Sequence, residues 1–420
     1  MQRKYRLILR LSALLLMVAS PGAHARGYAS TGKCGIYPRL AITSPSGTCV
    51  GLIADDAHGL RFPRRVLEIE PGRIWVLDMG NWMPQVGQLI ELRLPPDAAT
   101  PVNANTTARA VEARVLLSKL NYPSGMARGP DGKIYIGEAD KIWRAAVPSL
   151  GQTPQPELLA SGLPADGAHL LKELAFAPDG SLYVNMGSAT DACRGEDQKQ
   201  PVPCPERSTA MPRAAVWRLV LQAGKQPVKE FKPFASGLRN SMALAVMPDG
   251  PAAGTVWQGE NNIDYRDPKQ PPEELNLLRA GADYGWPYCI GARQNAQGYE
   301  KRFDCSKTEA PHMLWPAHVA PLQMLATPMG SAFGGQLLVA WHGQRADGQR
   351  LVGFARDDKG RPSGKPIQWL SNWDARPGLR PGGRPTGMGL DHAGRLLVVE
   401  DFNRSLLMLM SEAGTAPRPR

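Results

Sequence analysis

The feature that most constrains the fold is a recurring unit in which a tight turn is followed by a short, mostly apolar strand. In its clearest form the turn is Pro-Asp-Gly, as in Pro130-Asp131-Gly132, which precedes Lys133-Ile134-Tyr135-Ile136. Pro and Asp favour the start of a tight turn, Gly accepts the positive φ that the turn needs, and the apolar residues then enter a sheet. The unit recurs, in places degenerate, and its copies begin at Glu70, Pro130, Pro178, Pro248, Gly334 and His392.

A second strand-like segment follows several of these units, at 141–144, 215–219 and 405–408. Radial repetition of four-stranded blades produces such a pattern, so the sequence predicts an all-β fold, a six-bladed β-propeller. The 39 Pro and 44 Gly residues interrupt most windows that are long enough for a helix. A pair of β-sandwiches or a seven-bladed propeller remains open.

We expect residues 26–420 to form a single propeller domain. Long insertions between repeats are predicted near 185–214, 259–272 and 289–330, and loops of this length are usually functional, so we expect them to gather at one mouth of the propeller. The segment from Arg26 to Ser46 and the tail from Ala413 to Arg420 are expected to be poorly ordered.

The first residues are typical of an export signal. A basic segment with Arg3, Lys4, Arg6 and Arg10 precedes an apolar stretch from Leu11 to Val18, and Ala23-His24-Ala25 is a small-x-small cleavage site. We therefore predict a signal peptide over residues 1–25 and a periplasmic or secreted mature chain without a transmembrane segment; a retained N-terminal anchor is the alternative.

The whole chain has a formal net charge of +11, of which the signal peptide supplies four charges. The mature chain has neither a run of basic residues nor a basic amphipathic helix, so we expect no nucleic-acid partner. A small polyanionic ligand or solubility explains the remaining charge more simply.

The six cysteines fall into three couples that are local in sequence. An even number of cysteines in an exported chain favours disulfides, and local pairing is the simplest of the 15 possible connectivities. Free or metal-bound cysteines are the alternative, although the spacings match no zinc pattern. The predicted pairs are Cys34 with Cys49, Cys193 with Cys204, and Cys289 with Cys305.

The densest group of candidate functional residues lies between Gly237 and Gly291. Arg239 and Asn240 end one turn, a polar loop follows the next strand, and Glu273 and Glu274 come shortly afterwards. This set of residues suits an anionic ligand beside an oxygen-coordinated cation. Surface turns alone would explain any one of these fragments. Outside this region, His169 precedes the third repeat and could take a proton near neutral pH, or it could be structural.

Several fragments in a fixed order carry a resemblance to a known family. They are His169 with its Pro-Asp-Gly strand, Gly237-Leu238-Arg239-Asn240, Pro272-Glu273-Glu274-Leu275-Asn276, Ala282-Asp283-Tyr284-Gly285-Trp286-Pro287, Pro316-Ala317-His318-Val319-Ala320-Pro321-Leu322, Trp341-His342-Gly343 and Arg384-Pro385-Thr386-Gly387. Between about Val115 and Met410 the chain resembles the soluble pyrroloquinoline-quinone (PQQ)-dependent sugar dehydrogenases, in particular the glucose/sorbosone dehydrogenase branch.

The resemblance implies a propeller with PQQ over its central channel and Ca²⁺ bound to the quinone. His169 would be the general base, Arg239 would stabilise the oxygen at the reacting quinone carbon, and Asn240 would position the cofactor. The backbone carbonyls of Gly259 and Glu260 would bind the Ca²⁺ at the quinone, and Glu274, with Glu273 and the carbonyl of Tyr284, would bind a second Ca²⁺. Arg384 would bind one carboxylate of the cofactor, and Arg345 or Arg350 would bind another.

The resemblance also implies the reaction, which is oxidation of a sugar or a sugar-derived aldehyde or alcohol with electrons passed to a periplasmic acceptor. Residues 187–190 stand where the glucose-oxidising members have an acid, which favours a sorbosone-like substrate over glucose. A calcium-dependent propeller lactonase or hydrolase, or a non-catalytic carbohydrate- or protein-binding propeller, is the alternative. His318 and His342 can be functional or can only hold loops, and Asp78 and Asp401 are interpreted as turn acids.

Overall fold

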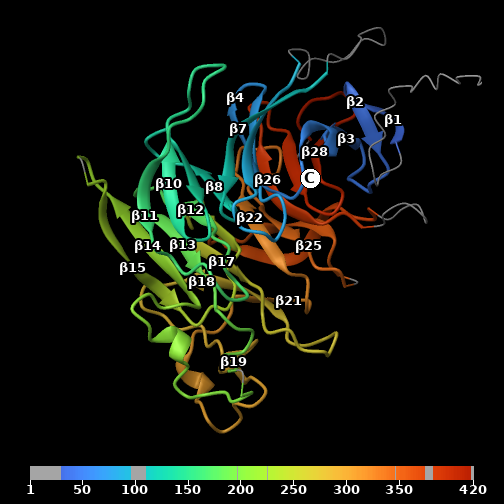
Figure 1. Ribbon diagram of the computed structural model, residues 1–420. Helices are drawn as coiled ribbons and strands as arrows, with labels where there is room; N and C mark the ends of the chain where they lie inside the picture. The colour runs from blue at the N-terminus through green and yellow to red at the C-terminus, as the bar shows by residue number, and fades with distance from the viewer. Residues whose placement is uncertain are drawn as a thin grey trace, which may run out of the picture.

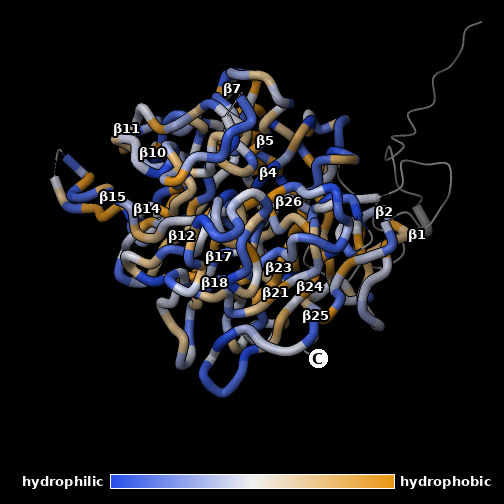
Figure 2. The backbone as a smooth tube through the Cα atoms, turned by 90° about the horizontal axis from the view of Figure 1, so that it is seen from below, coloured by the Kyte–Doolittle hydropathy of each residue, from blue (hydrophilic) through white to orange (hydrophobic). Residues whose placement is uncertain are grey.

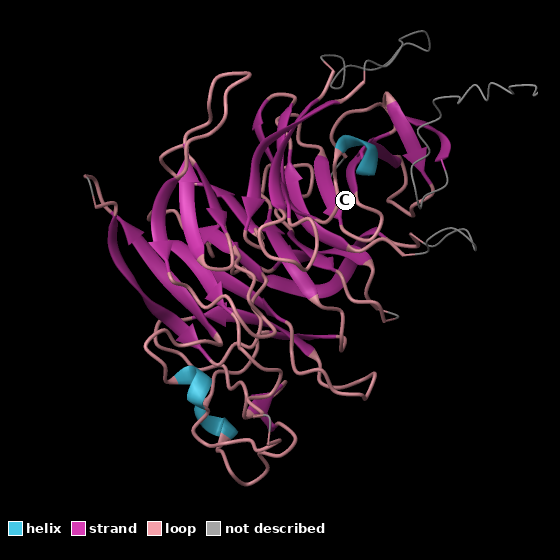
Figure 3. Ribbon diagram, in the orientation of Figure 1, coloured by secondary structure: helices cyan, strands magenta, loops and turns pink. Residues whose placement is uncertain are grey.

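The computed structural model describes residues 30–95, 110–373 and 382–417, apart from Glu196, Lys225 and Ala346. This part of the chain consists of strands, loops and short 3-10 helices, which are η1 (Asp56–His58), η3 (Pro205–Arg207) and η4 (Cys305–Lys307), as Figure 3 shows. Among the described residues, no helix is long and apolar enough to cross a membrane. The predicted signal peptide, residues 1–25, lies outside them.

The strands form six antiparallel blades around a ring, so the prediction of a six-bladed propeller is confirmed (Figure 1). Each of the first five blades has four strands. They are β4 (Pro63–Glu70), β5 (Arg73–Asp78), β6 (Gly87–Arg93) and β7 (Glu112–Leu120); β8 (Gly125–Arg128), β9 (Ile134–Gly137), β10 (Lys141–Ala145) and β11 (Glu157–Ser161); β12 (Leu174–Phe176), β13 (Leu182–Met186), β14 (Ala215–Leu221) and β15 (Val228–Ser236); β16 (Ala243–Val246), β17 (Val256–Glu260), β18 (Glu273–Leu278) and β21 (Met313–Trp315); β22 (Pro321–Ala326), β23 (Leu337–Trp341), β24 (Arg350–Arg356) and β25 (Pro362–Leu370).

The sixth blade joins the two ends of the described chain. Its inner strands are β26 (Pro385–Leu390), β27 (Leu396–Glu400) and β28 (Ser405–Ser411), and its next strand is β3 (Thr48–Ala54) from the N-terminal region. The sheet continues through β2 (Tyr37–Leu40) to β1 (Ser30–Cys34). The prediction that residues 26–46 are poorly ordered is therefore wrong for the β1–β2 hairpin, which the Cys34–Cys49 disulfide attaches to β3.

Each turn-and-strand unit of the sequence becomes the second strand of one blade. In blade 1, for example, Val76 of β5 pairs with Val66 of β4 and with Ile90 of β6. The apolar side chains of these strands fill the spaces between neighbouring blades, as Trp75 and Trp143 do between blades 1 and 2. In Figure 2 the labelled strands of successive blades follow one another around the ring.

The innermost strands meet around Arg65 of β4, whose side chain is fully buried. Its guanidinium forms an ion pair with Glu173, which precedes β12, through Nε at 2.9 Å and also through Nη2. It also donates hydrogen bonds to the carbonyl oxygens of Thr386 at 2.6 Å and Leu322 at 2.8 Å. One arginine of blade 1 is therefore bonded to blades 5 and 6 and to the segment entering blade 3.

The long insertions pack on one another in a side lobe next to blades 3 and 4. The lobe has its own apolar core, which includes Tyr288 and Tyr299, two disulfides and the short hairpin β19 (Cys289–Ile290) and β20 (Gln294–Asn295) (Figure 1). Residues 259 and 260, at the start of one predicted insertion, are the last residues of β17. The range 289–330 contains the whole of β21 and β22, two short strands that carry no turn-and-strand signal.

Candidate functional site

A cavity of about 500 Å³ opens at the centre of one face of the ring. Its walls come from the segments that enter the first strands of blades and from those that follow the second strands. In an antiparallel blade these two kinds of segment lie at the same end, so the topology brings them together. The lining residues are Arg61, Phe62, Arg64, Gly80, Asn81, Trp82, Ala168, His169, Leu171, Asn240, Met242, Leu322, His342, Arg384, Asp401, Phe402 and Arg404.

His169 lines this cavity, and its assignment as the catalytic base stays a prediction. Its Nδ1 lies 3.0 Å from the carbonyl oxygen and 2.9 Å from the hydroxyl of Ser188. A carbonyl can only accept, so Nδ1 carries the hydrogen and Nε2 keeps a lone pair. Burial, with the nearby charge of Arg239 as a smaller cause, lowers the pKa of His169 to about 3. The imidazole is therefore neutral at physiological pH and can accept a proton at Nε2.

Gly187 allows the loop after β13 to lie directly against His169. A Cβ at this glycine would come within 2.4 Å of the His169 carbonyl oxygen, which is closer than van der Waals contact permits. The backbone of the next residue, Ser188, donates to the carbonyl oxygen of Arg239 at 2.8 Å. Ser188 thus connects the histidine to the segment that enters blade 4.

Arg239 lies behind the cavity wall rather than in it. Its buried guanidinium donates to the carbonyl oxygens of Asp191 and Asn261 and pairs with the carboxylates of Asp191 at 2.7 Å and Asp264 at 2.8 Å. Its predicted contact with a quinone oxygen stays a prediction. Asn240, the next residue, does line the cavity.

Four arginines give the cavity a cationic wall, which Arg61, Arg64, Arg384 and Arg404 form. The only carboxylate among the lining residues is that of Asp401, which accepts from Nη1 of Arg64 at 3.1 Å. The Nε atoms of Arg61, Arg64 and Arg384 are buried and have no hydrogen-bond partner among the described residues. Such unpaired donors in a cationic cavity favour an anionic ligand with several acceptor oxygens.

Of these arginines, only Arg384 was predicted from the sequence. Arg345 and Arg350, the other predicted cofactor contacts, do not line the cavity. Arg345 is exposed and donates to the carbonyl oxygen of Asp267, whereas Arg350 begins β24 and donates to the carbonyl oxygen of Gly348.

Asp401 is more than a turn acid, so that prediction is wrong. It lies 3.1 Å from Nε2 of His342 and also holds Arg64. Burial opposes its ionisation, but the charges of His342, Arg64 and Arg384 outweigh burial and lower its pKa. Asp78, in contrast, is a turn acid, because it accepts from the backbone N–H groups of Arg61, Phe62 and Gly80.

The two histidines left open by the sequence have different surroundings. His342 lines the cavity and contacts Asp401, whereas His318 is not a lining residue and its Nε2 lies 2.8 Å from the carbonyl oxygen of Asp267 in an exposed loop. His342 therefore belongs to the candidate site and His318 to the loop.

The predicted calcium ligands Glu260, Glu273 and Glu274 are buried on the neighbouring strands β17 and β18. Burial raises the pKa of Glu260 and of Glu273 to about 8 and that of Glu274 to about 7, and Glu274 adds to the shift at Glu260. Their hydrogen-bond donors are neutral amides, such as Asn262 N–H to Glu273 at 2.6 Å. Within the described residues, none of these three carboxylates makes an ion pair within 4 Å.

The other predicted calcium ligands lie elsewhere. Gly259 and Glu260 are strand residues that do not line the cavity, and the Glu260 carboxylate accepts from the backbone N–H groups of Arg239 and Asn240. Tyr284 follows β18, and its hydroxyl donates to the carbonyl oxygen of Leu277. The described structure therefore does not bring the predicted calcium ligands together in the cavity, and calcium binding by Glu273 and Glu274 stays a prediction.

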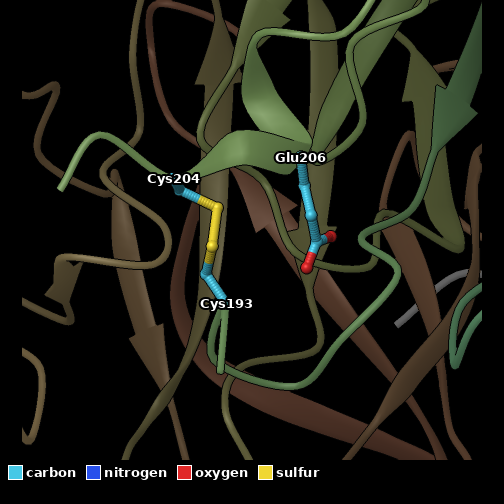
Figure 4. A group of neighbouring side chains, drawn as sticks. All are labelled: Cys193, Cys204 and Glu206. Carbon is cyan, nitrogen blue, oxygen red and sulfur yellow. A yellow bond between two sulfur atoms is a disulfide. The ribbon is translucent and has the colours of Figure 1, made fainter. Parts of the chain in front are cut away.

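All three predicted disulfides are present, namely Cys34–Cys49, Cys193–Cys204 and Cys289–Cys305. Glu206 lies beside the second of these pairs (Figure 4). Both sulfurs are bonded to each other, and the Glu206 carboxylate accepts from Thr190 and from the backbone N–H of Ala189, so this group holds the lobe together rather than a metal.

Comparison with known proteins supports the resemblance seen in the sequence. Residues 155–346 match the family model described as glucose/sorbosone dehydrogenase, which confirms the resemblance over this region. The matched region contains His169, Arg239 and Glu274 but ends before Arg384. No curated protein matches the chain significantly.

Solved structures of the same fold cover most of the chain. A Trichoderma reesei structure of carbohydrate-active enzyme family AA12 is 19% identical, with a TM-score of 0.69, and covers 91% of this chain and 100% of its own. The PQQ domain of Coprinopsis cinerea pyranose dehydrogenase is 18% identical, with a TM-score of 0.67, and the match covers 89% of this chain and 98% of that domain. The PQQ-bound aldose sugar dehydrogenase of Streptomyces coelicolor is 17% identical, with a TM-score of 0.55, and the match covers 88% of this chain and 100% of that chain. At these identities the similarity shows the fold.

Proposed function

We propose that this chain is a PQQ-dependent sugar dehydrogenase, on the premise that its residues 155–346 match the glucose/sorbosone dehydrogenase family. The observation that carries the proposal is the central cavity, which is lined by a neutral histidine and four arginines. A proton acceptor beside a polyanion site suits oxidation of a hydroxyl by an anionic redox cofactor.

The cavity fits PQQ, which is a flat tricarboxylate. The unpaired Nε atoms of Arg61, Arg64 and Arg384 offer donors to carboxylates, and planar guanidinium groups bind carboxylates well. The volume of about 500 Å³ lies within the range of small-molecule sites. The apolar residues Leu171 and Met242 of the wall suit the flat ring system. When bound, the quinone accepts the hydride of the substrate.

The residues of the chain would act on the substrate proton and on the position of the cofactor. Nε2 of His169 would take the proton of the reacting hydroxyl, while Ser188 holds Nδ1–H and thereby fixes the tautomer. Arg64 and Arg384 would hold carboxylates. The buried side chains of Leu171 and Met242 would exclude water from the deep part of the cavity.

The proposal also includes the predicted substrate, the calcium ion and export of the chain. Residues 187–190 contain no acid, which supports a sorbosone-like substrate rather than glucose. Glu273 and Glu274 would bind a calcium ion that stabilises the protein, and no step of the reaction is assigned to calcium. Export through the signal peptide at 1–25 agrees with three disulfides, and electrons would then pass to a periplasmic acceptor.

The first test is a titration of chelator-treated protein with PQQ, followed by the quinone absorbance, with and without added Ca²⁺. We expect stoichiometric binding, and bleaching of the bound quinone when an aldose or sorbosone is added. Absence of binding at micromolar PQQ would contradict the proposal and leave the lactonase or the non-catalytic propeller.

The Arg384→Ala variant is expected to raise the Kd for PQQ by about 10- to 100-fold, because it removes a charge-assisted contact to a carboxylate. The matched control is Arg345→Ala, since Arg345 is exposed and outside the cavity. Equal affinities of the two variants would place the cofactor somewhere other than this cavity.

The pH dependence of kcat/KM provides a further prediction. A base must be neutral to accept a proton, and the lowered pKa of His169, about 3, keeps it neutral well below pH 6. We therefore expect no loss of kcat/KM between pH 7 and about pH 5, whereas a histidine of ordinary pKa would lose activity near 6.5. The profile should be measured with circular dichroism at each pH, so that unfolding is excluded. A midpoint between 6 and 7 in folded protein would contradict the lowered pKa.

A further inference from the structure

Trp82 is a large aromatic side chain at the cavity to which the proposed reaction has so far assigned no role. It follows β5 and lines the cavity together with His169 and Arg404. Its side chain is 57% exposed, in contrast to Leu171 and Met242 of the same cavity, which are buried. The cavity therefore has a deep apolar part and an exposed aromatic ring at its mouth.

Trp82 contacts Phe62, and hydrogen bonds hold the loop that carries it. Its indole packs edge to face against Phe62, with the ring centroids 6.2 Å apart. Asp78 ties the loop to the segment before β4, because its carboxylate accepts from Gly80 N–H at 2.7 Å and Phe62 N–H at 3.0 Å. The next loop residues are held by Arg61, which donates to the carbonyl oxygen of Val86 at 2.6 Å. A ring held in place before a ligand arrives loses little entropy on binding.

The chemistry of the rim indicates what the ring would contact. Asn81 and Arg404 are exposed and line the same cavity as Trp82, so they add polar groups to its rim. A ligand that matches this rim has one apolar face and a periphery of hydroxyl groups. A sugar in its pyranose form has these properties, because its axial C–H groups form an apolar face and its hydroxyls lie around the edge.

We infer that Trp82 is a substrate-binding residue on which the pyranose ring of the sugar stacks, while the buried part of the cavity holds the cofactor. This inference rests on the proposed function and deepens it, because it assigns the residue that binds the sugar ring. The burial of the lining residues supports this arrangement of cofactor and substrate. A cofactor that stays bound occupies the buried part of the cavity, and a substrate that enters and leaves contacts the exposed rim.

The test compares Trp82→Ala, Trp82→Phe and Met83→Ala. Met83 is the matched control, since it is the next residue, is 58% exposed and does not line the cavity. For a hexose-derived sugar that the wild type oxidises, such as sorbosone, Trp82→Ala is expected to raise KM about tenfold with kcat within about twofold, because stacking is lost but the reacting groups remain. Trp82→Phe should recover most of the affinity, and Met83→Ala should match the wild type.

The KM of a small substrate shows whether the loss in Trp82→Ala comes from stacking on the ring of the sugar. Glyceraldehyde has no six-membered ring to cover the indole, so its KM should be the same in the wild type and in Trp82→Ala. An unchanged KM for the hexose in Trp82→Ala would overturn the inference. A large loss of PQQ affinity in Trp82→Ala, with the hexose KM unchanged, would overturn it as well, since the indole would then contact the cofactor.

A measurement without turnover separates the inference from the proposed function. Quinone-free protein is titrated with the hexose while tryptophan fluorescence is recorded. A signal change in the wild type and in Met83→Ala that is lost in Trp82→Phe supports sugar stacking even if PQQ does not bind. An identical change in Trp82→Phe would overturn the inference while leaving PQQ binding and dehydrogenase activity as separate results.

Discussion

Replacing His169 by glutamine is expected to lower kcat by about 10²- to 10⁴-fold, because the amide cannot take the substrate proton. The affinity for PQQ should change little, since the cofactor contacts are assigned to arginines on the other segments of the cavity wall. The measurement is single-turnover bleaching of the bound quinone after mixing with the sugar.

His318→Gln is the control for this variant. His318 is also a histidine that lies near a backbone carbonyl, but it is in an exposed loop outside the cavity. Its variant should keep the wild-type rate. If His169→Gln bound PQQ and kept its rate, the assignment of His169 as the base would be wrong.

Replacing Glu173 by glutamine is expected to lower the free energy of unfolding by about 3–5 kcal/mol, because the charge of Arg65 would remain buried without its carboxylate. Arg65 is fully buried and Glu173 is nearly so. The loss is measured from the midpoint and slope of urea unfolding. Asp166→Asn is the control, since Asp166 pairs with Arg213 at the surface with its side chain 81% exposed, and such pairs contribute about 0–1 kcal/mol.

A double-mutant cycle with Arg65→Met sharpens this prediction. Arg65→Met also leaves the carbonyl oxygens of Leu322 and Thr386 without their donor, so it is destabilising by itself. The double variant should be destabilised by less than the sum of the two single variants, because no unpaired charge remains. Additive effects, or a loss below about 1 kcal/mol for Glu173→Gln, would show that the pair does not hold the centre of the ring.

The fold could be predicted because its signal is local and repeated. Each unit such as Pro130-Asp131-Gly132 carries its own turn chemistry and enters the second strand of a blade, and six copies suffice to count the blades. The β1–β2 hairpin and β21 could not be predicted, because their short strands are stabilised by the sheets that they join and by Cys34–Cys49 rather than by their own sequence pattern.

The candidate site was predicted only in part. His169, Asn240 and Arg384 line the cavity as expected, since they occur in fragments with a recognisable order. Arg61 and Arg404 were missed, because they belong to segments at opposite ends of the chain that only ring closure brings together. The sequence signal that could have identified Arg61 and Arg404 is the presence of an arginine next to a strand end in each of these segments.

The role of Asp401 could not be predicted from the sequence either. A lone acid after a strand suggests a turn, and nothing local in the sequence reveals that His342 reaches it from blade 5 and Arg64 from β4 of blade 1. Contacts between residues 59 and 337 positions apart in the chain come from the circular arrangement, which a local pattern does not encode.

The pairing of β3 with β28 has a consequence for biogenesis. The register of this pair joins Cys49 to Met410, so the sixth blade cannot form until β28 has been synthesised. During translation the nascent polypeptide can be at most an open arc of five blades, with an apolar edge at each end exposed to chaperones and to aggregation. Closing such a long loop is a non-local event, and we expect it to be the late, rate-limiting step of maturation.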